Sequence, residues 1–163
     1  MTWVLQVSDD TKPEHVYELL KHHRLLPQSE VMAASICNGL GSGTRYMLMD
    51  GDTTVANLFV TGVAPMEIAQ LDLIPVVQFF RTGFDAPLRK SVMPILKALF
   101  EEEKVRRIES SIPASRSRTK RALCSLGFKP EGRLREGIVL YGKEPEDIRM
   151  LGMMPYDMPQ TED

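Results

Sequence analysis

Two strand–helix units follow one another between residues 67 and 136, and they constrain the fold more than any other part of the chain. Each unit starts with an apolar, strand-forming run and passes through a loop into a helix. The expected elements are a strand at 67–75, a polar, Gly-containing loop at 76–85, a helix at 86–103, a strand at 105–112, a basic helix at 116–126 and a third strand from 128. Such units predict a parallel pair of strands with crossover helices. The start of each helix presents free backbone N–H groups and can hold an anion.

Length and charge set the class of protein. The chain has 163 residues and a net charge of −2. This length suits one domain with a real core, which we place at residues 1–154, followed by a flexible tail at 155–163. The charge favours neither a nucleic-acid nor a membrane partner, and no apolar run approaches the ~20 residues that cross a bilayer. Cys37 and Cys124 show no metal spacing or disulfide framework, so we expect a reducing, cytoplasmic location.

A helix is predicted to begin after a first strand at residues 2–7. Thr11 and Glu14 have the spacing of a capping box, and Pro13 suits the first turn. His22 and His23 near the end of this helix could act as metal ligands or bases. A partly exposed helix end explains them better, because no Cys, Asp or His partner lies at ligand spacing.

The next segment combines a weak helix, a glycine-rich stretch and a hairpin. Residues 29–37 are weakly helical, and residues 38–43 (NGLGSG) predict a flexible loop near a substrate cleft. The loop is a poor phosphate cradle, because it does not lie between a clear strand and a clear helix. Strands at 45–49 and 53–60, joined by Asp-Gly-Asp, predict a β-hairpin.

Cations are unusually placed in both helices of the strand–helix units. Arg89 and Lys90 lie near a helix start, where they oppose the helix dipole unless a phosphate is bound. Residues 116–121 (RSRTKR) contain four cations. Their interpretations are a nucleic-acid patch, an anion site for a ligand phosphate, or a solvated helix face. The run lacks aromatic residues for base stacking, which weakens the first.

Residues 125–136 (SLGFKPEGRLRE) carry a resemblance to a known family. They resemble the closing segment of GNAT-superfamily N-acetyltransferases, in which a helix ends in Leu-Gly-Phe and a strand with Glu-Gly-x-Leu-Arg follows. Residues 141–151 are similar to the last hairpin of the branch that acetylates ribosomal-protein N-termini. The resemblance implies an α/β (α+β) domain with a mixed, mostly antiparallel sheet flanked by helices. One parallel strand pair would be splayed apart where coenzyme A inserts.

The resemblance also implies acetyl-CoA as donor and a primary amine of a protein or small molecule as acceptor. The family's pyrophosphate loop, Gln/Arg-x-x-Gly-x-Gly/Ala, is matched here by Gln78 and Gly83, whereas Arg81 replaces the first glycine. That replacement matters because glycine lets backbone N–H groups approach phosphate closely. The implied cofactor-binding residues are Gln78, Arg81, Thr82, Gly83, Arg89, Lys90, Ser91 and Thr119.

The general base is expected on the strand at 67–75. Glu67 and Asp72 are the carboxylates of this strand, and strand alternation places them on opposite faces. Either could accept the proton of the attacking ammonium, directly or through water. The resemblance favours Glu67 slightly, since many relatives carry the base glutamate on this strand. The alternative for each is an ordinary strand-end or solvent-facing carboxylate. The family's frequent acidic tyrosine falls at Leu123, so that role is vacant.

The sequence therefore predicts an enzyme, an acetyl-CoA-dependent N-acetyltransferase that works as a monomer or homodimer. A second hypothesis, suggested by the imperfect phosphate loop, is a catalytically degenerate GNAT-shaped module that binds a protein partner. A third, weaker hypothesis is a nucleic-acid binder that uses residues 116–121.

Overall fold

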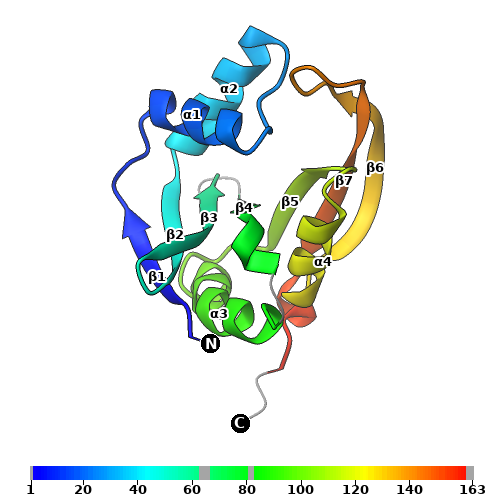
Figure 1. Cartoon of the computed structure of the whole chain (residues 1–163). Coiled ribbons are helices and arrows are strands. Elements are labelled where there is room, and N and C mark those ends of the chain that lie inside the picture. The colour runs from blue at the N-terminus through cyan, green and yellow to red at the C-terminus, as the bar shows by residue number, and fades with distance from the viewer. Residues whose placement is uncertain (1, 63–66, 81–82, 161–163) are drawn as a thin grey trace.

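A seven-stranded sheet forms the centre of the protein (Figure 1). The computed structural model describes residues 2–62, 67–80 and 83–160, with only the backbone described at 77 and 78. In spatial order the strands are β1 (Val4–Ser8), β2 (Thr44–Asp50), β3 (Thr53–Thr61), β4 (Ile68–Pro75), β5 (Arg107–Pro113), β7 (Glu146–Met153) and β6 (Lys129–Ile138). Neighbouring strands are antiparallel except for the parallel pair β4–β5. This confirms the predicted mixed, mostly antiparallel sheet.

The parallel strands β4 and β5 separate soon after they meet. They are in register at only three positions, and the last pair joins Gln70 to Glu109. Beyond this pair β4 continues to Pro75 and β5 to Pro113, each paired only with its outer neighbour. The predicted splay is therefore present, and it leaves the two inner strand edges open toward each other.

Four helices cover the sheet through two hydrophobic clusters. The helices are α1 (Pro13–His22), α2 (Glu30–Gly41), α3 (Asp85–Glu101) and α4 (Ser117–Ser125), with short 3-10 turns η1 (Val77–Phe80) and η2 (Pro155–Asp157). Leu71 and Leu73 of β4 belong to the main cluster with α3 and α4, whereas Ile74 belongs to the second cluster with α1 and α2. Because side chains alternate along a strand, the two helix pairs pack on opposite faces of β4.

The glycine-rich stretch at 38–43 is helical up to Gly41, so the predicted flexible loop is wrong. Ser29 caps the start of α2 by accepting a hydrogen bond from the Met32 N–H at 3.2 Å. Cys37 and Leu40 pack into the second cluster, and this burial outweighs the low helix propensity of glycine. A Cβ at Gly41 would lie 2.5 Å from the Thr11 carbonyl oxygen, so glycine is needed for packing rather than for flexibility.

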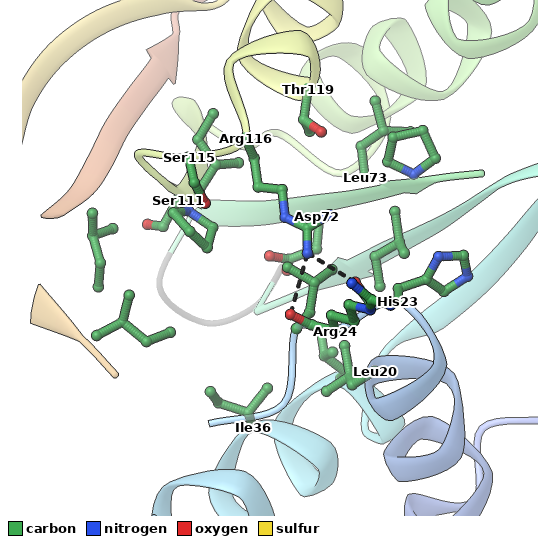
Figure 2. Close-up of a pocket in the computed structure, with 18 of the residues that line it drawn as sticks. Leu20, His23, Arg24, Ile36, Asp72, Leu73, Ser111, Ser115, Arg116 and Thr119 are labelled. Atoms are coloured by element: carbon green, nitrogen blue, oxygen red, sulfur yellow. Dashed lines mark hydrogen bonds between the residues drawn. The ribbon is translucent and has the colours of Figure 1, made fainter. Parts of the chain in front are cut away.

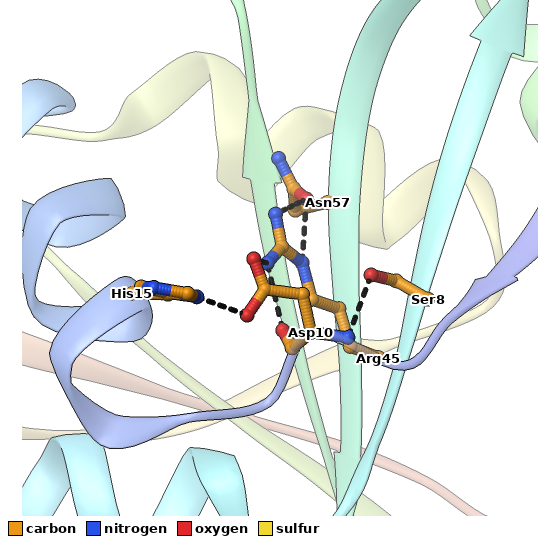
Figure 3. A network of polar contacts seen from close by, with 5 residues as sticks. All are labelled: Ser8, Asp10, His15, Arg45 and Asn57. Atoms are coloured by element: carbon orange, nitrogen blue, oxygen red, sulfur yellow. Dashed lines mark hydrogen bonds and ion pairs between the residues drawn. The ribbon is translucent and has the colours of Figure 1, made fainter.

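The start of α1 is held by a polar network instead of the predicted capping box. Pro13 lies in the first turn as expected, but no side chain caps this helix. His15 and Asp10 pair through Nδ1 and Oδ1, and this hydrogen bond lowers the pKa of Asp10 (Figure 3). Arg45 donates to the Asp10 carbonyl oxygen at 2.9 Å and to Oδ1 of the buried Asn57 at 2.8 and 3.0 Å. The network therefore fastens the β1–α1 connection to β2 and β3.

Helix α4 ends as its sequence predicts. Gly127 has a φ of +109°, and Phe128 is buried in the main cluster at 2% exposure. A Cβ on Gly127 would lie 2.5 Å from the Asp157 carbonyl oxygen of η2. Glycine therefore serves both the left-handed turn and the close approach of the chain after β7.

We expect Gly127→Ala to lower the free energy of unfolding by ~1–3 kcal/mol, because it combines a strained φ with a backbone clash. Gly132→Ala in β6 is the matched control, since a Cβ there meets nothing within 4 Å. Urea unfolding of both variants measures the difference. Equal stability of the two would contradict the role assigned to Gly127.

Candidate active site

A cavity of about 960 Å³ lies where β4 and β5 separate (Figure 2). Its walls come from the second half of β4, the end of β5, the start of α4 and the inner sides of α1 and α2. Phe80 of η1 and the hairpin residues Ile138 and Ile148 complete it. The splay thus creates a space that no single element could provide.

The cavity connects the two faces of the sheet. Leu73 and Asp72 are neighbours on β4 and point to opposite faces, yet both line it. Figure 2 shows Thr119 and Leu73 on one side of Asp72, and Leu20 and Ile36 on the other. One side of the cavity therefore belongs to α4, and the other to α1 and α2. A donor and an acceptor could approach each other from these two sides.

Asp72 is the only carboxylate among the described residues that line the cavity. It is partly buried on the face that β4 turns toward α1 and α2, two residues before Ile74 of the second cluster. Burial raises the pKa of Asp72 from 3.8 to about 6, against a smaller opposing effect of the Gln70 side chain. Near neutral pH this carboxylate can therefore accept a proton and release it again.

Arg116 joins α4 to the end of α1 across the cavity. Its Nη2 donates to the His23 carbonyl oxygen at 2.8 Å and to the Arg24 carbonyl oxygen at 3.2 Å. Arg24 follows α1 with a φ of +57°. Burial, followed by the charges of His22 and Arg116, lowers the pKa of His23, which also lines the cavity. His23 is therefore a neutral polar group there at physiological pH.

Residues 23–28, which we call the strap, continue from α1 to the β6–β7 hairpin. The Gln28 N–H donates to the Val139 carbonyl oxygen, and the Tyr141 N–H donates to the Leu26 carbonyl oxygen, both at 2.9 Å. Pro27 and Leu140 form an isolated antiparallel bridge between these bonds. The strap therefore ties the end of α1 to the hairpin, next to Arg24, Leu25 and Ile138, which line the cavity.

The start of α4 faces the cavity with features that suit an anion. Ser117, Arg118 and Thr119 line the cavity, and no side chain caps the helix. The guanidinium carbon of Arg118 lies 5.8 Å from the centre of the Phe80 ring. The free N–H groups and the cation together can hold a phosphate or a polarised carbonyl oxygen.

The two predicted catalytic carboxylates are in different places. Asp72 lies in the cavity. Glu67 precedes β4 with a φ of +60°, is not part of the lining, and pairs with Arg106 at 2.8 Å. The geometry therefore provides a base candidate in Asp72 and gives Glu67 a local contact at the surface.

The predicted cofactor residues are also divided. Thr119 lines the cavity and is 7% exposed, whereas Gly83, Arg89, Lys90 and Ser91 are not part of the lining. Arg89 donates to the Ser125 carbonyl oxygen at 3.3 Å, and the Ser91 hydroxyl donates to the Trp3 carbonyl oxygen at 3.1 Å. For Gln78 the side chain is not described, and Arg81 and Thr82 lie outside the described residues. The cofactor roles of these residues stay predictions.

Sequence reasoning missed the contribution of His23 and Arg116 to the cavity. From the sequence, the two histidines are interpreted as a helix end, and Arg116 as part of a basic run at a position where the family's pattern has an asparagine. Their contact joins residues 93 positions apart. No local pattern in the sequence marks such a contact. The sequence does show Arg116 at the start of the predicted helix at 116–126, but not what it binds.

Comparison with solved structures identifies the fold. Spermidine N-acetyltransferase from Vibrio cholerae, in complex with CoA and spermine, has a TM-score of 0.66 at 13% identity, with 96% of this chain and 97% of that chain covered. Mutant forms of the spermidine/spermine N-acetyltransferase SpeG from the same organism have a TM-score of 0.66 at 13% identity, with 94% of both chains covered. The chain has a GNAT-like fold. At this identity the similarity shows the fold alone.

A third structure agrees with this assignment. It belongs to a protein described only as a candidate acetyltransferase and has a TM-score of 0.68 at 17% identity, covering 96% of this chain and 84% of that one. Neither a protein-family model nor a curated protein sequence matches the chain. Within the described ranges, no helix is both long and apolar enough to span a membrane, and no three metal-ligating side chains are gathered to hold an ion.

The raised pKa of Asp72 predicts that the difference in stability between the wild type and Asp72→Asn depends on pH. Well below pH 3.8 the carboxyl is protonated in the folded and unfolded states, so burial carries no charge penalty. Above pH about 6 it is ionised in both states, and the folded state alone bears the buried charge. The wild type therefore loses stability relative to Asp72→Asn as pH rises through this window.

We expect Asp72→Asn to be more stable than the wild type by ~1–2 kcal/mol at pH 7.5 and by no more than a few tenths of a kcal/mol at pH 4. Urea unfolding at both pH values measures this difference. Asp52→Asn, in the exposed β2–β3 turn, is the control and should show no pH-dependent gain. A gain for Asp72→Asn that is as large at pH 4 as at pH 7.5 would exclude burial of the charge as its cause.

Proposed function

We propose that the protein is an acetyl-CoA-dependent N-acetyltransferase that acts on a primary amine. The observation that carries this proposal is the cavity at the β4–β5 splay, with an anion-compatible helix start on one side and the carboxylate of Asp72 on the other. The GNAT-like fold, shared with N-acetyltransferases, supports it.

The residues of the cavity fit acetyl-CoA as donor. Arg118 and the free N–H groups at the start of α4 offer positive charge for its phosphates. The open edges of β4 and β5 offer unpaired backbone groups to an amide-containing arm, which would add to the sheet as a short strand does. The donor supplies an activated acetyl thioester, and the chain positions it.

Asp72 faces the side from which an acceptor would come. An ammonium must lose a proton before its nitrogen can attack the thioester carbonyl carbon, and Asp72 is placed to accept that proton. Attack forms the C–N bond, cleavage of the C–S bond follows, and the thiolate leaves with a proton. Backbone N–H groups of β4 beyond Gln70 are the candidates that stabilise the oxyanion. The net products are an amide, free CoA thiol and one proton.

One observation favours the second hypothesis, a GNAT-shaped binding module without catalysis. Arg89 and Ser91, which were expected to meet the phosphates, already donate to the carbonyl oxygens of Ser125 and Trp3. Together with Arg81 in place of a motif glycine, this makes the phosphate loop differ from the family pattern. Binding of acetyl-CoA therefore has to be measured before turnover is interpreted.

Isothermal titration calorimetry should detect acetyl-CoA binding to the wild type. We expect Arg118→Ala to raise the dissociation constant for acetyl-CoA ~10-fold, because one charge-assisted phosphate contact is lost. Arg121→Ala is the matched control, since this cation is on the same helix, is exposed and does not line the cavity. No heat and no thermal stabilisation at millimolar acetyl-CoA would leave the binding module as the better description.

Asp72→Asn should lower kcat/KM by ~10²-fold and remove an acid limb near pH 6 from the pH–rate profile. The rate of CoA-thiol release, with an amine that the wild type acetylates, measures this effect. Glu67→Gln is the comparison. It should keep the wild-type kcat/KM and the acid limb of the pH–rate profile, because Glu67 is outside the cavity. If all three proteins share one profile, neither carboxylate is the base and catalysis rests on positioning.

A further inference from the structure

We infer that the acceptor is a small amine with one positive charge and an apolar body, and that it is not a polyamine. This inference rests on the proposed function, because it names the acceptor class of the same cavity. It follows from three features of the wall that Asp72 faces: its charge, its apolar surface and the strap beside it.

The charge of the lining fits one ammonium group. Among the described lining residues Asp72 is the sole carboxylate, and the cations Arg24 and Arg116 lie at the end of α1 in the same cavity. A triamine such as spermidine carries about three positive charges at neutral pH. Asp72 can pair with one of these ammonium groups. The other ammonium groups would lose their hydration near guanidinium groups and would have no carboxylate partner. The cavity therefore selects against a second ammonium.

The surface around Asp72 fits an apolar body. On the side of α1 and α2 the wall has four aliphatic side chains besides the histidines and Arg24 at the end of α1, and the hairpin adds two more. These aliphatic residues are Leu20, Leu25, Ile36, Leu40, Ile138 and Ile148. An apolar substituent of the amine would gain ~25 cal/mol per Å² that it buries against them. A polar chain gains nothing comparable and loses its hydration.

The strap favours a small molecule over a polypeptide. The hydrogen bonds of Leu26 and Gln28 tie the strap to the hairpin beside the lining residues Leu25 and Ile138, so the backbone is continuous on this side of the cavity. Arg116 fixes the beginning of the strap through the His23 and Arg24 carbonyl oxygens (Figure 2). A peptide that continues past its first residue would have to break these contacts to leave on this side. An amine of about ten heavy atoms would not.

The shared fold does not contradict this assignment. The solved spermidine N-acetyltransferase is named for a polyamine and was captured with spermine. Its identity with this chain is 13%, so the residues that choose the acceptor are free to differ. The inference thus predicts that this chain and the spermidine N-acetyltransferase use different classes of acceptor on the same fold.

The decisive experiment compares three acceptors with the wild-type protein. The acceptors are 2-phenylethylamine, spermidine and the peptide Met-Leu-Gly, each tested with acetyl-CoA by CoA-thiol release. We expect kcat/KM for 2-phenylethylamine to exceed both others by ~10²-fold or more, because the cavity rejects unpaired charge and a continuing chain. Preference for spermidine or the peptide overturns the inference.

A calorimetric titration with acetyl-CoA separates this inference from the proposed function. If acetyl-CoA does not bind, the proposed function fails and the acceptor inference fails with it. If acetyl-CoA binds and spermidine or the peptide is preferred, the proposed function stands and the acceptor inference alone fails. If acetyl-CoA binds and none of the three amines is acetylated, the acceptor inference is likewise wrong.

A pair of variants on α2 tests the mechanism of selection. Ile36→Glu adds a second carboxylate to the aliphatic wall, so it should lower kcat/KM for 2-phenylethylamine ~10-fold and narrow its advantage over spermidine. Val31→Glu on the same helix is the control, because Val31 is 83% exposed and lies outside the lining. Circular dichroism melts of both variants show whether Ile36→Glu remains folded. An unchanged ratio of the two rates in a folded Ile36→Glu would contradict selection by the wall.

Discussion

The early end of pairing between β4 and β5 is the constraint on which the rest of the structure depends. Three register positions hold the strands together, and beyond Gln70 and Glu109 each strand is paired on one side only. Open strand edges inside a protein need partners. The cavity, the two helix pairs on opposite faces and the position of Asp72 all follow from this opening in the sheet.

The two hydrophobic clusters explain how such an opening is tolerated. The main cluster holds α3 and α4 against the sheet, and the second holds α1 and α2 against Phe59 and Ile74. The main cluster also spans the splay, because it contains Leu71 and Leu73 of β4 together with Ile112 of β5. Arg116 and the strap add a few hydrogen bonds to backbone carbonyl oxygens. Stability thus resides in the clusters, while the shape of the cavity depends on these polar contacts.

Local patterns in the sequence predicted much of the fold and less of the site. The hairpin at 50–52 and the αL position of Gly127 follow from local turn chemistry, and the parallel pair followed from two strand–helix units. The helical stretch up to Gly41 was missed because tertiary burial, which is not local, decided it. The contact of Arg116 with His23 and the bridge from Pro27 to Leu140 join distant segments, so spacing alone could not reveal them.

The position of Asp72 in the cavity also has a consequence for what happens after acetyl transfer. An amine arrives as a cation and gains an electrostatic contact with Asp72, whereas its amide product is neutral and has no such contact. In the proposed reaction, the chemical step therefore removes the attraction between Asp72 and the bound amine. The product keeps the contact with the aliphatic wall but loses the ionic contact with Asp72, so accumulated amide would inhibit the enzyme less than a tightly bound cation would.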